Sequence, residues 1–230
     1  LQPVLRDPFS VVFGLVQPLF FLALYGPLLV GQLRGTPATA VWAWFVPAIL
    51  VMVTLFGTAS TGSNLLYEFQ TGAHERMLVA PLSRAALFLG RALKEVVPLV
   101  AQAMVVVLVM VPFGFRFDVL GALAGLALLA IMGLGVGSLS YALAIAVRKT
   151  DWMFWVVQQT VLFPVMITSG MLLPLDTAPG WLRVLSRLNP LTYVVDAERA
   201  LFAGRWELSV LLGLVAAVIT AGIGLLAGLR

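Results

Sequence analysis

Few patterns in this sequence combine residue types that could do chemistry. His74 and Glu75 begin like the HExxH motif of zinc proteases, but Leu78 stands where the second histidine ligand would be needed. His74 is the only histidine and the chain has no cysteine, so a metal site of this kind cannot form. Ser138 ends a Gly-Val-Gly-Ser run that faintly resembles a nucleophile turn, yet it lies in a long apolar segment without a histidine base. No phosphate-binding GxxxxGKS or GxxxxGKT motif occurs, and we predict no catalytic residue, metal or cofactor in this chain.

The composition indicates a membrane protein. Of 230 residues, 61% are hydrophobic and 10% are charged, whereas charged residues make up about a quarter of a soluble domain. The net charge of +4 comes from scattered basic residues, which favours contact with anionic lipid headgroups over nucleic acid. Since helices satisfy their own backbone groups in lipid, we predict an all-α integral membrane protein.

Six apolar segments reach the length of about 20 residues that a helix needs to cross a bilayer. None of them contains Asp, Glu, Lys, Arg or His. We predict a single transmembrane domain over residues 1–230, with spans at 9–30, 41–66, 96–115, 119–147, 152–175 and 208–229.

The basic residues between these segments predict the orientation. With six spans both termini share one face, and that face also receives most of the basic residues: Arg6, Arg76, Arg84, Arg91, Lys94, Arg148, Lys149 and Arg230. Arg34 and Arg116 lie in short connections on the other face. The positive-inside rule then places both termini in the cytoplasm. We expect the membrane to be a bacterial inner membrane. The segment 176–207 carries four arginines on the outer side, but four acidic residues balance them.

The connection 67–95 is the longest polar interruption in the first half of the chain. It must lie in water, because each of its charges would cost several kcal/mol in hydrocarbon. The spans hold no ionisable residue for a proton relay, so energy for uphill transport would enter from a separate subunit through this loop. A short amphipathic helix ending at Pro81 is predicted here, which could fit a partner's groove or rest on the bilayer surface. Its apolar face is formed by Phe69, Ala73, Met77 and Ala80.

The segment 176–207 contains two further amphipathic stretches, separated by Asn189 and Pro190. Two short helices dipping into the outer leaflet would bury both apolar faces, and a loop resting on the surface is the alternative. The apolar residues are Trp181, Leu182, Val184, Leu185 and Leu188 in the first stretch, and Leu191, Val194, Val195 and Leu201 in the second.

Pairs of glycines at GxxxG spacing predict close helix contacts, within the subunit or in a dimer. They are Gly121/Gly125, Gly133/Gly137 and Gly224/Gly228.

Two stretches together resemble the type-2 ABC exporter permeases, most of all the drug-efflux subgroup typified by daunorubicin-resistance permeases. They are TGAHERMLVAPLSRAALFLGRALKE at 71–95 and SGMLLPLDTAPGWLRVLSRLNPLTYVVDAERALFAG at 169–204. The resemblance covers nearly the whole chain, including the number and order of the spans.

The resemblance implies a cytoplasmic coupling helix that docks on an ABC ATPase, and short re-entrant outer helices before the last span. It also implies a second permease copy, identical or related, with ATP and Mg bound by the ATPase subunits. The coupling residues would be Glu68, Phe69, Gly72, His74, Glu75, Arg76, Met77, Pro81 and Arg84, and those of the outer segment Trp181, Asn189, Pro190, Tyr193, Glu198 and Arg199.

We therefore predict a non-catalytic permease of an ATP-driven exporter for a hydrophobic or amphipathic, drug-like compound. A lipid-linked polysaccharide exporter and a membrane-embedded structural protein remain open alternatives. The candidate cargo path uses the few polar or aromatic groups of the spans, namely Gln17, Tyr25, Asn64, Gln102 and Gln159. Since Gln158 and Gln159 are adjacent, we expect at most one of them to face that path. The glutamines could equally hold helices together.

Overall fold

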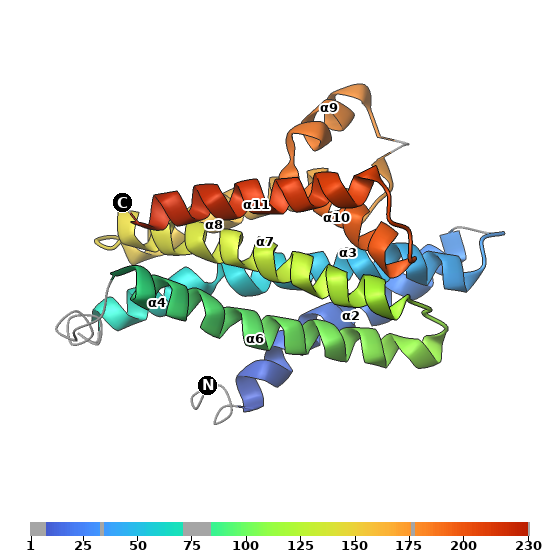
Figure 1. Cartoon of the computed structure of the whole chain (residues 1–230), viewed down its shortest axis with the longest axis horizontal. Helices are drawn as coiled ribbons and strands as arrows, with labels where there is room; N and C mark the ends of the chain where they lie inside the picture. The colour runs from blue at the N-terminus through green and yellow to red at the C-terminus, as the bar shows by residue number, and fades with distance from the viewer. Residues whose placement is uncertain (1–7, 33–34, 71–83, 176–177, 230) are drawn as a thin grey trace.

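The structure is a computed structural model that describes residues 8–32, 35–70, 84–175 and 178–229. Over these residues every regular element is a helix, and the long helices run side by side in one elongated bundle (Figure 1). In chain order they are α2 (Pro8–Gln32), α3 (Ala38–Ala59), α4 (Thr61–Gln70), α6 (Arg84–Met110), the 3-10 helix η1 (Val111–Phe113), α7 (Val119–Ala146), α8 (Asp151–Thr168), α9 (Gly180–Leu188), α10 (Pro190–Phe202) and α11 (Leu208–Leu229). The predicted all-α fold class is confirmed for this part of the chain.

Four stretches of the described residues are long and apolar enough to cross a bilayer. These stretches, Ala38–Gln70, Val96–Phe113, Val119–Ala146 and Leu208–Gly228, match the second, third, fourth and sixth predicted spans. Helices α2 and α8 occupy the first and fifth predicted positions. The chain is therefore a multi-pass membrane protein, while the count of six spans stays a prediction.

The second predicted span, 41–66, is not one continuous helix. It divides at Ser60 into α3 and α4. The hydroxyls of Thr58, Ser60 and Thr61 donate to backbone carbonyls three or four residues earlier, at 2.6–2.8 Å. Hydroxyls bonded in this way compete with the helical ladder and bend helices, which accounts for a break in an otherwise apolar segment.

The fifth predicted span, 152–175, extends past the C-terminal end of the observed helix. Helix α8 stops at Thr168, and Gly170 follows with a φ of +73°, a conformation that favours glycine. Eighteen helical residues rise about 27 Å, which is slightly less than the hydrocarbon thickness of about 30 Å. Asn189, at the start of α10, bonds to the last turn of α8, and Phe202 at the end of α10 accepts a hydrogen bond from the Asp118 N–H before α7. Helix α10 thus extends the course of α8 toward the end of the bundle where α7 begins.

Helix α10 lies in the centre of the molecule rather than on its surface. Its residues Leu191, Val194, Val195 and Leu201 are buried, and it packs on α3, α7 and α11. The two short helices predicted before the last span are present as α9 and α10, but only α10 buries its apolar face within the chain. Helix α9 stands away from the bundle (Figure 1), and the apolar side chains of Trp181, Val184, Leu185 and Leu188 are exposed.

Glycines allow the helices to approach closely within this one chain. A Cβ on Gly125 would lie 2.6 Å from the Glu198 carboxylate of α10, and one on Gly135 would lie 2.7 Å from the Ala221 nitrogen of α11. Gly224 in turn faces the carbonyl of Gly135. Of the two alternatives left open for the GxxxG pairs, packing within the subunit is found for five of the six glycines, which all lie against other helices of the chain: Gly121, Gly125, Gly133, Gly137 and Gly224.

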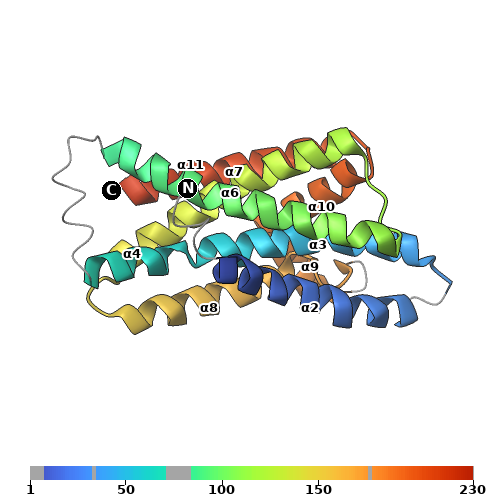
Figure 2. The same cartoon turned by 90° about the horizontal axis from the view of Figure 1, so that it is seen from below.

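The connections fall at two opposite ends of the bundle (Figures 1 and 2). The end of α2, η1 and the end of α10 lie at one end, together with the starts of α3, α7 and α11. The end of α4, the starts of α6 and α8 and the end of α11 lie at the other. This grouping agrees with the predicted alternation of the connections.

Candidate functional site

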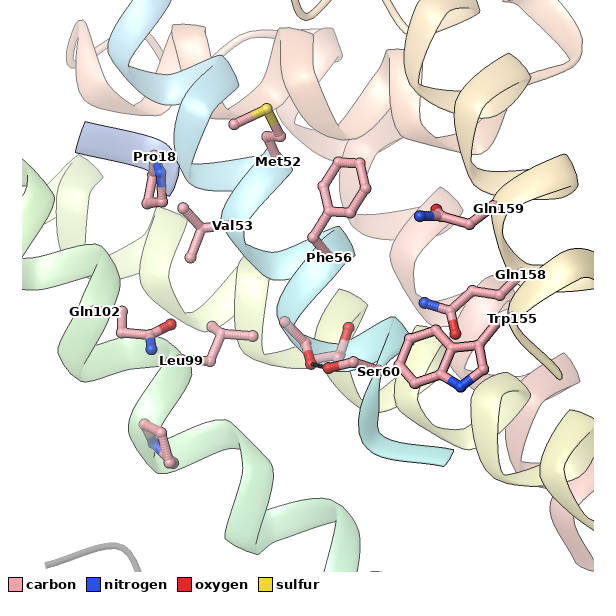
Figure 3. A pocket seen from close by; sticks show the side chains of 13 residues that line it. Pro18, Met52, Val53, Phe56, Ser60, Leu99, Gln102, Trp155, Gln158 and Gln159 are labelled. Carbon is pink, nitrogen blue, oxygen red and sulfur yellow. Dashed lines mark hydrogen bonds between the residues drawn. The ribbon is translucent and has the colours of Figure 1, made fainter. Parts of the chain in front are cut away.

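A cavity of about 470 Å³ lies among α2, α3, α6 and α8 (Figure 3). Its volume falls in the range of about 300–1,000 Å³ that is usual for small-molecule sites. None of its described lining residues carries a charge. The wall consists of apolar residues (Pro18, Met52, Val53, Phe56, Pro98, Leu99, Trp155), Gly57, and polar residues (Thr58, Ser60, Gln102, Gln158, Gln159).

Three glutamines supply amide groups to this cavity from two opposite sides. Gln102 comes from α6, and Gln158 and Gln159 come from α8 across from it (Figure 3). Gln158 is buried, and its Oε1 has no hydrogen-bond partner in the part of the chain that is described. We expected at most one of the two adjacent glutamines to face a cargo path. Both border this cavity, because it wraps around one side of α8.

The hydroxyl groups of the cavity wall already donate hydrogen bonds to backbone carbonyls. Thr58 donates to the Thr54 carbonyl at 2.6 Å, and Ser60 donates to the Gly57 carbonyl at 2.8 Å. Hydrogen-bonding capacity toward a ligand therefore rests with the glutamine amides.

The structure places the other predicted path residues differently. Gln102 and Gln159 border the cavity, whereas Tyr25 packs against Phe45 with ring centroids 5.7 Å apart. Asn64 is exposed on α4, away from the cavity wall. The side chain of Gln17 lies outside the described residues, although its neighbour Pro18 lines the cavity.

Sequence reasoning missed Thr58, Ser60 and Trp155 as cavity residues. A cluster of small polar residues at 57–63, Gly-Thr-Ala-Ser-Thr-Gly-Ser, interrupts the apolar second span. That cluster was the available signal, because small and hydroxyl residues mark places where helices break or approach closely.

The break at Ser60 is held against α7 by a pair of hydrogen bonds. The Gly62 N–H donates to the Ser140 Oγ at 2.9 Å, and the Ser140 hydroxyl donates to the Ala59 carbonyl. Gly62 has no room for a side chain, since a Cβ there would lie 2.7 Å from the Phe154 ring. Ser140 therefore ties the end of α3 and the start of α4 to one point on α7.

The predicted coupling residues fall mostly outside the described part of the chain. Glu68 and Phe69 lie on the last turn of α4, and Arg84 is the first residue of α6, although its side chain is not described. Gln70 at the end of α4 donates to the Asp151 carboxylate at the start of α8. The remaining residues, Gly72, His74, Glu75, Arg76, Met77 and Pro81, lie outside the described residues.

Arg199 connects three helices at the opposite end of the bundle. Its Nε donates to the Trp44 carbonyl of α3 at 3.0 Å, its Nη2 donates to the Gly170 carbonyl after α8 at 2.9 Å, and its Nη1 lies 3.4 Å from the Asp196 carboxylate. The guanidinium also lies over the Trp44 ring, 4.1 Å from its centroid. Such cation–π and carbonyl contacts use the planar shape of the guanidinium.

Asn189 and its neighbours join α8, α9 and α10. The Asn189 Nδ2 donates to the Val165 carbonyl at 2.6 Å and to the Thr168 Oγ1 at 2.9 Å, while its Oδ1 accepts from the Leu191 N–H and caps α10. Pro190 takes the first helical position of α10, where its missing N–H is harmless. The Tyr193 hydroxyl donates to the Arg187 carbonyl at 2.8 Å. The Asn-Pro-Leu-Thr-Tyr motif is therefore a helix junction, and Trp181 lies exposed on α9.

Glu198 is fully buried on α10, and neither of its carboxylate oxygens has a hydrogen-bond partner among the described residues. Burial raises the pKa of the Glu198 carboxyl from 4.5 to about 8. Its carboxylate lies against Gly125 of α7, where a Cβ would come within 2.6 Å of the Glu198 Oε2. Neutral Glu198 therefore packs in the core at neutral pH.

Comparison with known proteins identifies the class to which these features belong. The family model described as "ABC-2 type transporter" matches residues 1–203. The chain therefore belongs to the ABC-2 type transporter family, as a membrane permease of an ABC transporter, which confirms the resemblance found in the sequence.

Named relatives agree with this assignment. A transport permease of Cyanophora paradoxa, ycf38, is 29% identical over 206 residues, covering 86% of this chain and 69% of its own length. The daunorubicin resistance ABC transporter permease DrrB1 of Streptomyces coeruleorubidus is 25% identical over 218 residues, covering 91% and 76%. A doxorubicin resistance ABC transporter permease, DrrC, of Mycobacterium tuberculosis is 26% identical over 224 residues, covering 95% and 78%.

Proposed function

We propose that this chain is the membrane subunit of an ATP-driven exporter that moves a hydrophobic or amphipathic compound out of the cytoplasm or the inner leaflet. The observation that carries this proposal is the cavity of about 470 Å³, whose wall combines apolar side chains with three glutamines and no charge. The names of two relatives, which refer to daunorubicin and doxorubicin resistance, support a drug-like cargo.

The physical reason is the cost of dehydration. A charged solute would lose its water in this cavity and gain no ionic partner from the described wall, which costs many kcal/mol. An amphipathic molecule loses little against Phe56 and Trp155, and its polar groups can bond to the amides.

The energy would come from a separate ABC ATPase that binds ATP and Mg. We propose that the connection 67–95 provides the predicted coupling helix, which ends at Pro81 and docks on this ATPase, and that a second permease copy completes the transporter. Movement of that helix would reach the cavity through α4, because α4 adjoins the coupling residues and starts at Thr61, directly after Ser60, which lines the cavity. Six spans with both termini in the cytoplasm would place the coupling helix on the ATP side.

The experiment begins with the tagged chain purified from its native membranes. We expect a P-loop ATPase to co-purify, and its ATP hydrolysis in lipid nanodiscs to rise severalfold when doxorubicin is added. The variants Glu75→Lys and Arg76→Glu should insert and express normally but lose this stimulation, because loss of one member of a buried charge pair costs about 2–5 kcal/mol at an interface. Recovery of the chain without any ATPase, or full stimulation in both variants, would argue against the proposal.

A further inference from the structure

Helix α8 has a hollow on each side, and Gln158 borders both of them. One hollow is the cavity of about 470 Å³ described above. The other is an apolar groove of about 260 Å³ that is lined by residues of α3, α7, α8 and α11 and by Pro190 and Leu191 of α10. Gln158 lines both hollows, so its side chain lies where the two spaces meet.

The Oε1 atom of Gln158 is a buried acceptor that the described chain does not satisfy. Its accessible surface is negligible and it has no hydrogen-bond partner among the described residues. Buried acceptors are nearly always bonded, because an unmet one costs free energy that was spent in removing it from water. An unmet acceptor beside two hollows therefore points to a partner outside the described residues. Because the Oε1 atom itself is enclosed, such a partner meets it when the Gln158 amide turns toward a hollow and its oxygen and nitrogen exchange places.

The hydroxyl groups of both hollows cannot serve as that partner, because their protons are already used. Ser140 donates to the Ala59 carbonyl and Thr220 donates to the Ala216 carbonyl at 2.8 Å in the groove wall. In the cavity wall, Thr58 and Ser60 also donate to backbone carbonyls. Every hydroxyl that lines either hollow is thus committed to a helix backbone.

The apolar groove defines what else the partner must be. Apart from Gln158 and the two committed hydroxyls, its wall consists of aliphatic side chains and Met132. On the cavity side, the Trp155 and Phe56 rings flank the same amide (Figure 3). A molecule that fills either space must be apolar over most of its surface and must carry a donor at the point that meets Gln158.

We propose that Gln158 is the hydrogen-bond acceptor of a binding site for membrane-soluble molecules that combine an apolar ring system with a hydroxyl or amine donor. The site lies at the junction of the groove and the cavity, so such a molecule can reach it from the bilayer along α8. The inference rests on the proposed function only in naming this molecule as cargo, since binding itself requires no ATPase.

The test compares two probes that differ in whether their oxygen carries a hydrogen or a methyl group. Pyrenemethanol carries a hydroxyl donor, and its methyl ether has the same ring system without the donor. Binding to the full chain in lipid nanodiscs is measured by energy transfer from tryptophan to pyrene, with empty nanodiscs correcting for partition into lipid. We expect the alcohol to bind about three- to tenfold more tightly than the ether, the difference that one hydrogen bond to a buried acceptor makes.

Matched variants test whether Gln158 causes the preference for the alcohol over the ether. Gln158→Met removes the acceptor at nearly constant volume and should abolish the preference, whereas Gln159→Met, at the exposed neighbour in the same cavity wall, should keep it. Equal binding of the two probes to the unmodified chain would overturn the site, and so would tighter binding of the ether or a preference that survives Gln158→Met. A preference without ATP-driven transport would instead contradict the proposed function and leave this site standing.

Discussion

At the scale of single residues, Arg199 joins α10 to α3 and to the end of α8. It reaches carbonyls 155 and 29 positions away in the sequence and covers the Trp44 ring. Arg199→Lys keeps the charge but cannot make both carbonyl contacts and the ring contact at once. We expect it to lower the free energy of unfolding by about 1–3 kcal/mol, measured as thermal unfolding in detergent. Arg183→Lys, an exposed position on α9, is the matched control and should change little; equal effects of the two substitutions would argue against the role of Arg199.

Glu198 leads to a prediction about pH. Because burial raises its pKa to about 8, the folded protein holds a proton that the unfolded chain releases above its ordinary pKa of 4.5. The contribution of Glu198 to the free energy of unfolding should therefore be largest below about pH 4.5. It should fall as the pH rises to about 8, by at most about 1.4 kcal/mol per pH unit. The other described charged groups at this end of the bundle are Arg116, Asp118, Asp196, Arg199, Arg205 and Glu207, while α3, α7 and α11 contain no Asp, Glu, Lys, Arg or His within their bounds.

Melting temperatures between about pH 6 and about pH 9 test this prediction. The unmodified chain should lose stability across this interval, and Glu198→Gln should flatten the profile because a neutral side chain replaces the titrating one. Glu207→Gln at an exposed position serves as the control and should leave the slope unchanged. An identical slope in the chain and in Glu198→Gln would mean that another group titrates.

The sequence identified which polar residues matter better than it identified their partners. Gln102 and Gln159 were selected as rare polar groups of the apolar spans, and both border the cavity. Asn189 and Arg199 were selected through the resemblance to the exporter permeases, and both join helices. Their partners are backbone carbonyls on other helices, which carry no sequence signal. At most one of Gln158 and Gln159 was expected to face the path because they are adjacent in the sequence, yet both border the cavity.

At the scale of helices, the close approach of α10 and α11 depends on a glycine. A Cβ on Gly213 of α11 would lie 2.7 Å from the Tyr193 carbonyl, whereas a Cβ on Gly222 of the same helix meets nothing within 4 Å. We expect Gly213→Ala to cost about 1–3 kcal/mol through displacement of α10, and Gly222→Ala to be neutral or stabilising by up to about 1 kcal/mol. Thermal unfolding of both variants measures the difference; equal stabilities would contradict the packing of α10 against α11.

Element positions could be predicted because long apolar segments in lipid must be helical. Element ends could not be predicted as well. Hydropathy continues past Thr168 and across Ser60, so it does not reveal the positive φ at Gly170 or the hydroxyl-to-carbonyl bonds that divide α3 from α4. The central place of α10 was also hidden, because its amphipathic pattern fits a surface helix as well as a helix that buries one face against three others.

At the scale of the whole molecule, the two groups of connections should face opposite sides of the membrane. The chain has no cysteine, so each introduced cysteine is a unique label site. We expect His74→Cys to react with an impermeant maleimide only in inverted vesicles, and Arg183→Cys only in intact cells, because the positive-inside rule places residues 67–95 in the cytoplasm. Labelling of His74→Cys from outside intact cells would reverse the orientation.

The proposed function requires that ATP hydrolysis moves an amphipathic molecule through this permease. Inverted vesicles that contain the chain and its co-purified ATPase provide the direct measurement, with uptake of doxorubicin and of a small hydrophilic ion followed in parallel. We predict ATP-dependent accumulation of doxorubicin, and no accumulation of the ion, because the described cavity offers no charged partner to replace its water. The proposed function would be contradicted if the vesicles took up the hydrophilic ion and if no lipophilic compound or lipid-linked glycan changed the rate of ATP hydrolysis.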